Sequence, residues 1–229
     1  TEINALQQDM QRAQSPEDKS KIQGQINELK AQKPKMSNNL AFLFRYQLGH
    51  MYFRYFMWNF AGRQNDKQGH SFNHKIEGAW ISGIPIVDNF RLGPQDGMPD
   101  HLAKNAARNK YFFIPLIIGI LGLILHFKKS KNDAIITMTL FVFTGILIII
   151  FLNQPPFEPR ERDYSHVGSF QTFCIWIGLG VLFIWDWLKT KMNATNAAIL
   201  ASIISLSAPI LMGNQGWDDH DRSSRYLGI

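Results

Sequence analysis

Four apolar stretches constrain this chain more than any other feature of its sequence. They cover residues 111–127, 134–152, 168–188 and 194–212. Each is close to the roughly 20 apolar residues that an α-helix needs to cross the hydrocarbon core of a bilayer. Small residues in the last two stretches would let helices approach closely in lipid, where no hydrophobic force drives them together. We therefore expect an all-α membrane protein with a bundle of four transmembrane helices.

The chain divides into four segments of different character. Residues 1–33 show helical apolar spacing and an N-cap signal, which predicts a polar helical hairpin. Residues 34–110 combine an aromatic stretch with loops punctuated by glycine and proline, and we expect an interfacial helix followed by ordered loops. Residues 111–212 hold the four spans. Residues 213–229 form a polar tail that we expect to lead into a further, soluble domain.

Lysines in two short connections predict the orientation of the spans. Lys128, Lys129 and Lys131 follow the first span, and Lys189 and Lys191 follow the third. Short loops rich in lysine face the cytoplasm. The connection between the second and third spans therefore faces outward, as do both ends of the chain.

Composition excludes some classes of function. The formal net charge is +6, but the basic residues are divided among membrane flanks and motifs of mixed sign. A nucleic-acid-binding face needs clustered basic residues, so we expect no nucleic-acid partner. The single cysteine, Cys174, lies inside a span, which excludes an intrachain disulfide.

The outward connection between the second and third spans is the leading candidate site. Its sequence, NQPPFEPRERDYSHVGS, places alternating charges between two apolar spans. Charged groups beside hydrocarbon are costly and by default mark functional sites. Arginine offers a planar fork suited to phosphate, which beside a membrane belongs to a lipid headgroup or a lipid-linked sugar. A self-paired charge cluster that ties loops together explains the same spacing equally well. The candidate residues of this connection are Arg160, Arg162, Asp163 and Tyr164.

A second group of polar residues precedes the first span. Gln47, His50 and Arg54 fall on one side of a helical wheel, at i, i+3 and i+7. Such a helix would present a polar stripe to protein or water and aromatic side chains to lipid. The GRQND loop follows it. We expect the second-rank residues of the same cavity to be Gln47, His50, Arg54, Arg63, Asn65 and Asp66.

The tail carries a dense acidic motif, WDDHDRSSRY. A hard cation could bind carboxylates of this kind, but acids adjacent in sequence point in different directions and seldom form a site alone. We therefore expect the motif to hydrogen-bond to the outward loops, and no metal cofactor. The residues concerned are Asp218, Asp219, His220 and Asp221.

Five motifs in order carry a resemblance to a known family. They read FLFRYQLGHMYFRYFMWNFAGRQND, RLGPQ, ARNKYFFIPLIIGILGL, FLNQPPFEPRERDYSHVGSFQTFCIWIGLGV and APILMGNQGWDDHDRSSRY. The set strongly resembles the large multi-pass membrane proteins of Bacteroidetes that are grouped with the protein O-mannosyltransferase-like glycosyltransferases, formerly a domain of unknown function. The resemblance covers nearly all of the chain after Pro34.

The resemblance implies part of an enzyme with a C-type glycosyltransferase fold in a bacterial inner membrane, with both ends of this chain periplasmic. Such enzymes transfer a sugar from a polyprenyl-phosphate donor on the outer face, and the resemblance favours donor binding by Arg160 and Arg162. In this type of fold the catalytic acid lies in an earlier outward loop. We therefore expect that loop upstream of Thr1 and a soluble domain downstream. Membrane lipids and the lipid-linked sugar are the expected partners, with no further cofactor. A non-catalytic membrane scaffold or accessory subunit is the alternative.

Overall fold

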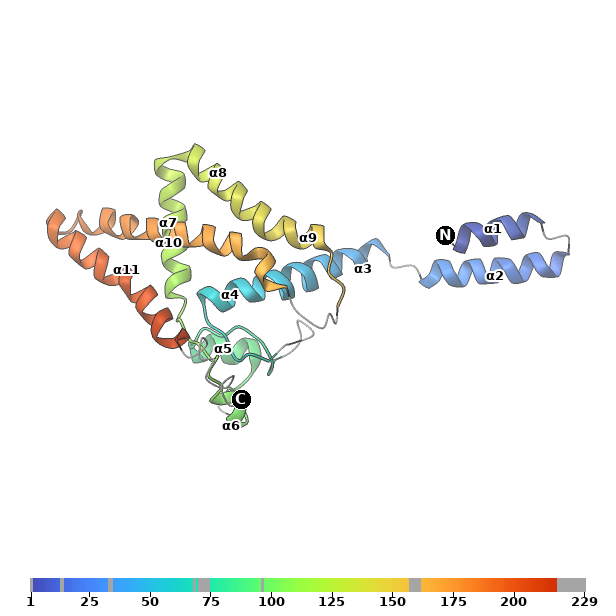
Figure 1. Ribbon diagram of the computed structural model, residues 1–229, viewed down its shortest axis with the longest axis horizontal. Coiled ribbons are helices and arrows are strands. Elements are labelled where there is room, and N and C mark those ends of the chain that lie inside the picture. The colour runs from blue at the N-terminus through green and yellow to red at the C-terminus, as the bar shows by residue number, and fades with distance from the viewer. Residues whose placement is uncertain are drawn as a thin grey trace, which may run out of the picture. The chain divides into compact units, whose positions relative to one another are not determined.

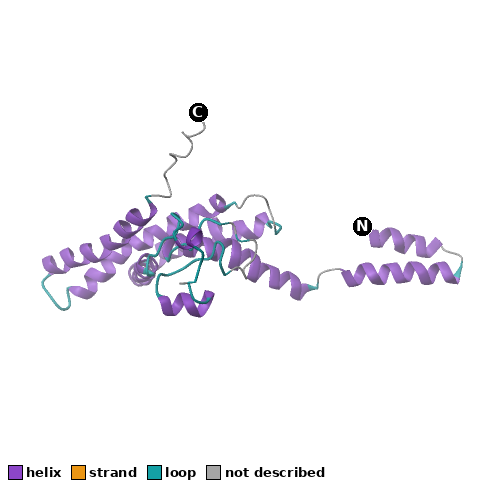
Figure 2. Ribbon diagram, turned by 90° about the horizontal axis from the view of Figure 1, so that it is seen from below, coloured by secondary structure: helices purple, strands orange, loops and turns teal. Residues whose placement is uncertain are grey.

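The computed structural model of the protein describes residues 2–12, 15–32, 35–67, 69, 75–95, 97–156 and 162–217. Regular structure in these ranges is helical, and the one β-type pairing within them is an isolated antiparallel bridge between Arg63 and Trp80 (Figure 2). The expectation of an all-α protein is confirmed for this part of the chain. The fold divides into two compact units, Thr1–Leu43 and Phe44–Ile229.

The first unit consists of short polar helices. Helices α1 (Glu2–Arg12) and α2 (Pro16–Gln32) pack against each other, and α3 (Met36–Ala41) follows. The backbone N–H of Glu17 donates a 3.3 Å hydrogen bond to the Ser15 hydroxyl, which satisfies one of the free donors at the start of α2.

Three helical stretches of the second unit are long and apolar enough to cross a membrane. The first, Lys131–Leu152, is a continuous run of α8 (Lys131–Val142), η2 (Phe143–Leu147) and α9 (Ile148–Leu152). The second, Tyr164–Leu188, joins η3 (Asp163–His166) to α10 (Val167–Leu188), and the third is α11 (Ala194–Gly216). Lengths of 22, 25 and 23 residues match the hydrocarbon thickness of a bilayer. The expectation of a membrane protein is confirmed at this level.

The first expected span forms a helix that is short for a membrane crossing. It forms α7 (Ile114–Lys129), a helix of 16 residues. At 1.5 Å per residue α7 is about 24 Å long, less than the roughly 30 Å of a hydrocarbon core. Phe112 and Phe113 precede it with φ angles of 52° and 58°, in the left-handed region that side chains seldom adopt. This sharp entry sets the start of the helix at Ile114, and the described residues contain three full-length spans where the sequence predicted four.

Glycines allow α7 and α10 to cross in close contact (Figure 1). A Cβ atom on Gly122 would lie 1.8 Å from the carbonyl oxygen of Trp176, and one on Gly180 would lie 2.3 Å from that of Ile118. The two backbones therefore touch at this crossing. Small residues serve the same purpose at helix contacts in membranes generally.

Side-chain contacts link neighbouring helices at both ends of the bundle. At one end, Asp186 of α10 pairs with Lys129 at 3.3 Å and with Lys189, so the two lysine-bearing connections meet. At the other end, the Gln215 side chain near the end of α11 exchanges two hydrogen bonds with the backbone of Lys110, just before α7. The two lysine connections therefore share one end of the helices, opposite the start of α7 and the end of α11.

An aromatic core fixes the helix that precedes the loops. Helix η1 (Phe42–Phe53) continues into α4 (Arg54–Phe60), and α4 packs on α10. The Phe56 and Phe60 rings lie 4.9 and 4.5 Å from the Phe173 ring, within the range of favourable aromatic pairs. The loops that follow α4 include two short helices, α5 (Pro85–Leu92) and α6 (Asp100–Ala103).

Candidate functional site

The connection between α9 and η3, which the sequence predicts to face outward, is described at both of its ends. Asn153 terminates α9 with a φ of 42°, a left-handed conformation that asparagine tolerates better than most residues. At the other end, Arg162 and Tyr164 are exposed, and η3 begins at Asp163. Arg160 lies outside the described residues. The three described candidates of this loop therefore stand at the start of the α10 span.

The polar stripe predicted on η1 and α4 lies against the beginning of this loop. The Gln47 side-chain amide donates a 2.7 Å hydrogen bond to the Asn153 side-chain oxygen, across 106 positions of sequence. Gln47 and His50 are both buried, and the His50 ring stacks on Tyr46 with centroids 5.5 Å apart. The structure thus brings second-rank candidates to the same place as the leading candidate loop.

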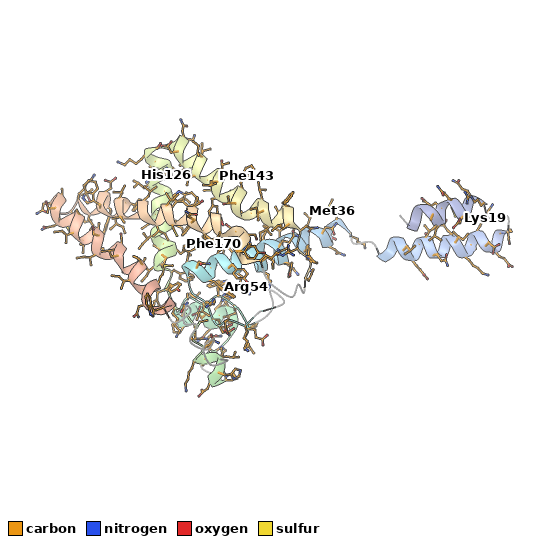
Figure 3. The ribbon with its side chains drawn as sticks, viewed as in Figure 1. Lys19, Met36, Arg54, His126, Phe143 and Phe170 are labelled. Carbon is orange, nitrogen blue, oxygen red and sulfur yellow. The ribbon has the colours of Figure 1, made fainter. Side chains whose placement is uncertain are left out.

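Arg54, labelled in Figure 3, belongs to α4 and joins it to a loop. Its side chain is buried, with only 6% exposed. Its guanidinium donates to the carbonyl oxygens of His50, at 3.0 Å, and Gly78, at 3.1 Å. The same group lies 4.6 Å from the Tyr55 ring centroid and 4.8 Å from that of Trp58. Carbonyl oxygens and ring faces together compensate the loss of water around a buried cation.

His166 anchors the other end of the outward loop on the same helix. It is fully buried, with ring centroids 5.9 Å from Tyr52 and 6.1 Å from Tyr55. The Tyr52 hydroxyl donates to Ser169, whose hydroxyl donates in turn to the His166 carbonyl oxygen at 2.8 Å. Burial raises the pKa of Tyr52 to about 12, so this phenol stays protonated at neutral pH. Both described ends of the loop are therefore fastened to η1 and α4.

Two π-helical segments meet beside these anchors. Helix η1 is π-helical over 12 residues, and η2 interrupts the long stretch Lys131–Leu152 with a π-helical turn. A Cβ atom on Gly145 of η2 would lie 2.7 Å from the Tyr52 ring and 2.8 Å from the Cβ atom of Ser169. π-Helical turns are rare and occur frequently at functional sites. Sequence analysis missed them because apolar periodicity does not separate an α-helix from a π-helix.

The residues of the GRQND loop make structural contacts. Asn65 is fully buried, donates to the Ile76 carbonyl oxygen at 2.8 Å, and accepts from the Gly78 N–H at 2.9 Å. Arg63 donates to the carbonyl oxygen of Ala107 at 3.1 Å. Asp66 is exposed and accepts a hydrogen bond from the Asn105 amide. Arg63 and Asn65 therefore tie loop segments together.

A polar cavity that sequence analysis did not predict lies among these loops. Its volume is about 300 Å³, and Asp88, Gln95 and Arg108 are among its lining residues. Asp88 is buried and accepts hydrogen bonds from the backbone and hydroxyl of Ser82 and from the backbone of Gly83. Burial lowers the pKa of Arg108, and the nearby Asp88 charge opposes that shift. Asp88 lies six positions after Ser82, a separation that no short turn motif encodes, so no local sequence signal predicted this contact.

The acidic tail motif, from Asp218 to Asp221, lies outside the described residues. Within the described ranges, no group of three or more histidine, cysteine, aspartate or glutamate side chains is arranged to hold a metal ion.

Comparison with known proteins finds no match to this chain among family models, curated proteins or solved structures. The resemblance to the protein O-mannosyltransferase-like glycosyltransferases therefore stays a prediction that depends on the sequence motifs.

Proposed function

We propose that this chain forms the donor-binding part of an integral membrane glycosyltransferase. The enzyme transfers a sugar from a polyprenyl-phosphate-linked donor on the outer face of a bacterial inner membrane. The donor's phosphate binds at the outward connection, with Arg160 and Arg162 as its principal contacts. The other candidates for donor contact in this connection are Asp163 and Tyr164.

One observation carries the proposal. The outward connection is fastened at both described ends to η1 and α4, through Gln47 to Asn153 and through the Tyr52 and Tyr55 rings to His166. Arg162 is therefore held at the end of a membrane span, where a lipid-linked phosphate would lie. A loop whose backbone is held at both ends loses less conformational entropy when it binds a ligand.

The proposed orientation places the lysine connections in the cytoplasm and the outward connection, with both ends of the chain, in the periplasm. The contact of Lys129 and Lys189 with one carboxylate supports a shared side for the two lysine connections. The bonds between Lys110 and Gln215 support a shared side for the flanks of α7 and α11. In this arrangement α7 is a fourth, short crossing, and tilting of neighbouring helices or local thinning of the bilayer accommodates its length.

Arginine suits the chemistry of the proposed reaction. When the sugar leaves its carrier, negative charge builds up on the phosphate, and cationic donors aimed at that charge stabilise the transition state. A guanidinium can give two parallel hydrogen bonds to one phosphate, which a lysine ammonium cannot.

Thermal stability with and without a polyprenyl monophosphate tests this proposal. The ligand should stabilise the detergent-solubilised full chain, because it binds the folded state. Arg162→Lys and Arg160→Lys should each weaken binding roughly tenfold to hundredfold, the equivalent of about 1.5 to 3 kcal/mol for a lost charge-assisted hydrogen bond. Arg12→Lys, at an exposed position of α1, is the matched control and should leave the ligand-induced shift unchanged. If the Arg160 and Arg162 variants both retain the full shift, the loop does not bind phosphate.

A non-catalytic scaffold is the second candidate, and specific contacts favour it. Arg54, Arg63 and Asn65 all donate to backbone carbonyl oxygens of the loops between α4 and α7. If the outward arginines act in the same way, their replacement should lower the melting temperature of the unliganded protein. Under the proposed function, replacement should instead reduce the effect of the ligand in protein that remains folded.

A further inference from the structure

An apolar groove lies between three helices, away from the outward connection. It has a volume of about 660 Å³ and is bounded by α7, α10 and α11. Figure 1 shows α10 and α11 diverging from their shared end, with α7 crossing α10. Lining side chains come from all three helices and include Ile114, Ile117, Leu121, Phe183, Trp187 and Ile204.

The lining offers almost nothing to a polar ligand. Ser207 is the one hydroxyl-bearing residue among the lining residues, and it donates to the carbonyl oxygen of Ile204 at 2.5 Å. A sugar or an ion in this groove would lose its hydration without gaining hydrogen bonds, which is unfavourable. Because two of the bounding helices are long enough to span the membrane, the surrounding solvent is lipid. A hydrocarbon chain is the ligand that matches this surface.

The end of the groove nearest the lysine connections carries a positive charge. Trp187 lines the groove and is 56% exposed, and the Lys191 Nζ atom lies 5.9 Å from its ring centroid. The neighbouring Lys189 is already paired with Asp186. Lys191, by contrast, has no carboxylate partner in the part of the chain that the structure describes. A cation held over an aromatic ring beside an apolar groove suits a ligand with an anionic head and an apolar tail.

We propose that this groove binds an anionic phospholipid from the leaflet that faces the lysine connections. One acyl chain lies in the groove, and the phosphate of the headgroup lies at Lys191 above Trp187. A transmembrane helix is a poorer occupant, because a helix 30 Å long and 10–12 Å wide occupies roughly 3,000 Å³, several times the groove. The site lies at the opposite end of α10 from Arg162, so it is independent of the proposed donor site.

Native mass spectrometry of the full chain in detergent, with added phosphatidylglycerol or phosphatidylcholine, tests the proposal. Phosphatidylglycerol should bind more tightly than phosphatidylcholine with the same acyl chains. Lys191→Gln should reduce the affinity for phosphatidylglycerol roughly fivefold, as expected for one lysine at an anionic lipid surface. Lys128→Gln removes the same charge from the other lysine connection and should have a smaller effect.

A second pair of variants tests the acyl chain. Ser207→Phe fills the groove and should reduce the binding of both lipids, whereas Ile199→Phe adds the same ring at an exposed position of α11 that does not line the groove. Equal affinity for the two lipids, or equal effects of Lys191→Gln and Lys128→Gln, would overturn the headgroup assignment. Unchanged lipid binding by folded Ser207→Phe protein would overturn the groove itself. Should that variant not fold, the lysine pair still decides the proposal.

Discussion

Single glycines decide how closely the helices of this protein pack. Gly122 faces the backbone of α10, whereas Gly178 of α10 has no neighbouring atom within 4 Å of an added Cβ. The two positions therefore share a residue type and differ in their surroundings. Composition alone cannot separate them, because both lie in apolar helices.

Gly122→Ala should destabilise the protein. The added Cβ would lie 1.8 Å from the Trp176 carbonyl oxygen, so the helices must separate. Overpacking of this kind typically costs about 1–3 kcal/mol of unfolding free energy. Gly178→Ala is the control and should be neutral or stabilising, because alanine favours helix by up to about 1 kcal/mol. Unfolding by denaturant titration in detergent measures both variants, and equal stability would show that the close crossing is not formed.

Asp88→Ala should also destabilise the protein. Its carboxylate accepts three hydrogen bonds from Ser82 and Gly83, and removing it leaves buried donors without this partner. Each such donor costs about 1–3 kcal/mol. Asp100→Ala is the control, since Asp100 forms one exposed pair with Lys104, and such pairs contribute about 0.3–0.5 kcal/mol. If the two variants melt at the same temperature, Asp88 does not organise the loop.

Sequence analysis grouped Gln47, His50 and Arg54 on one side of a helix, and the structure shows all three buried. It did not foresee that Gln47 bonds to Asn153 or that His166 packs on the rings of the same helical segment. Those contacts join residues more than 100 positions apart, and no local spacing encodes them.

At the scale of helices, the length of an apolar stretch predicted the membrane spans well. The sequence did not indicate which segments are π-helical. The stretches that contain α8, α10 and α11 were predicted as spans and have that length. The stretch that contains α7 was also predicted as a span, but it forms a helix of only 16 residues, preceded by Phe112 and Phe113 in left-handed conformations. The hydropathy of a segment indicates whether lipid or water surrounds it. The residue at which its helix begins depends instead on tertiary contacts.

The link between η1 and the end of α9 should be measurable as a coupling energy. Gln47 donates to Asn153 at 2.7 Å, and a hydrogen bond of this kind contributes about 0.5–1.5 kcal/mol. A double-mutant cycle of Gln47→Ala and Asn153→Gly isolates this term, because glycine keeps the left-handed backbone of position 153. Additive effects of the two substitutions would show that the contact does not hold the loop.

At the scale of the whole molecule, the sequence indicated a helical membrane protein and the structure agrees. The loops between α4 and α7 were predicted only as ordered, and their contacts could not be derived. Backbone carbonyl oxygens hold Arg54, Arg63 and Asn65, and every residue supplies such an oxygen, so no residue type marks the partner. The proposed function depends on one property of the whole molecule, which is the separation of the outward connection from the lysine connections by the bilayer.

Cysteine labelling in intact cells tests this separation most directly. Cys174→Ser removes the single cysteine, and Ser130→Cys and Ser165→Cys then place one thiol beside the lysine connection or the outward connection. A reagent that cannot cross the inner membrane should label Cys at 165 and not at 130, whereas both should react after the membrane is disrupted. Labelling at position 130 alone, or equal labelling at both positions in intact cells, would contradict the account.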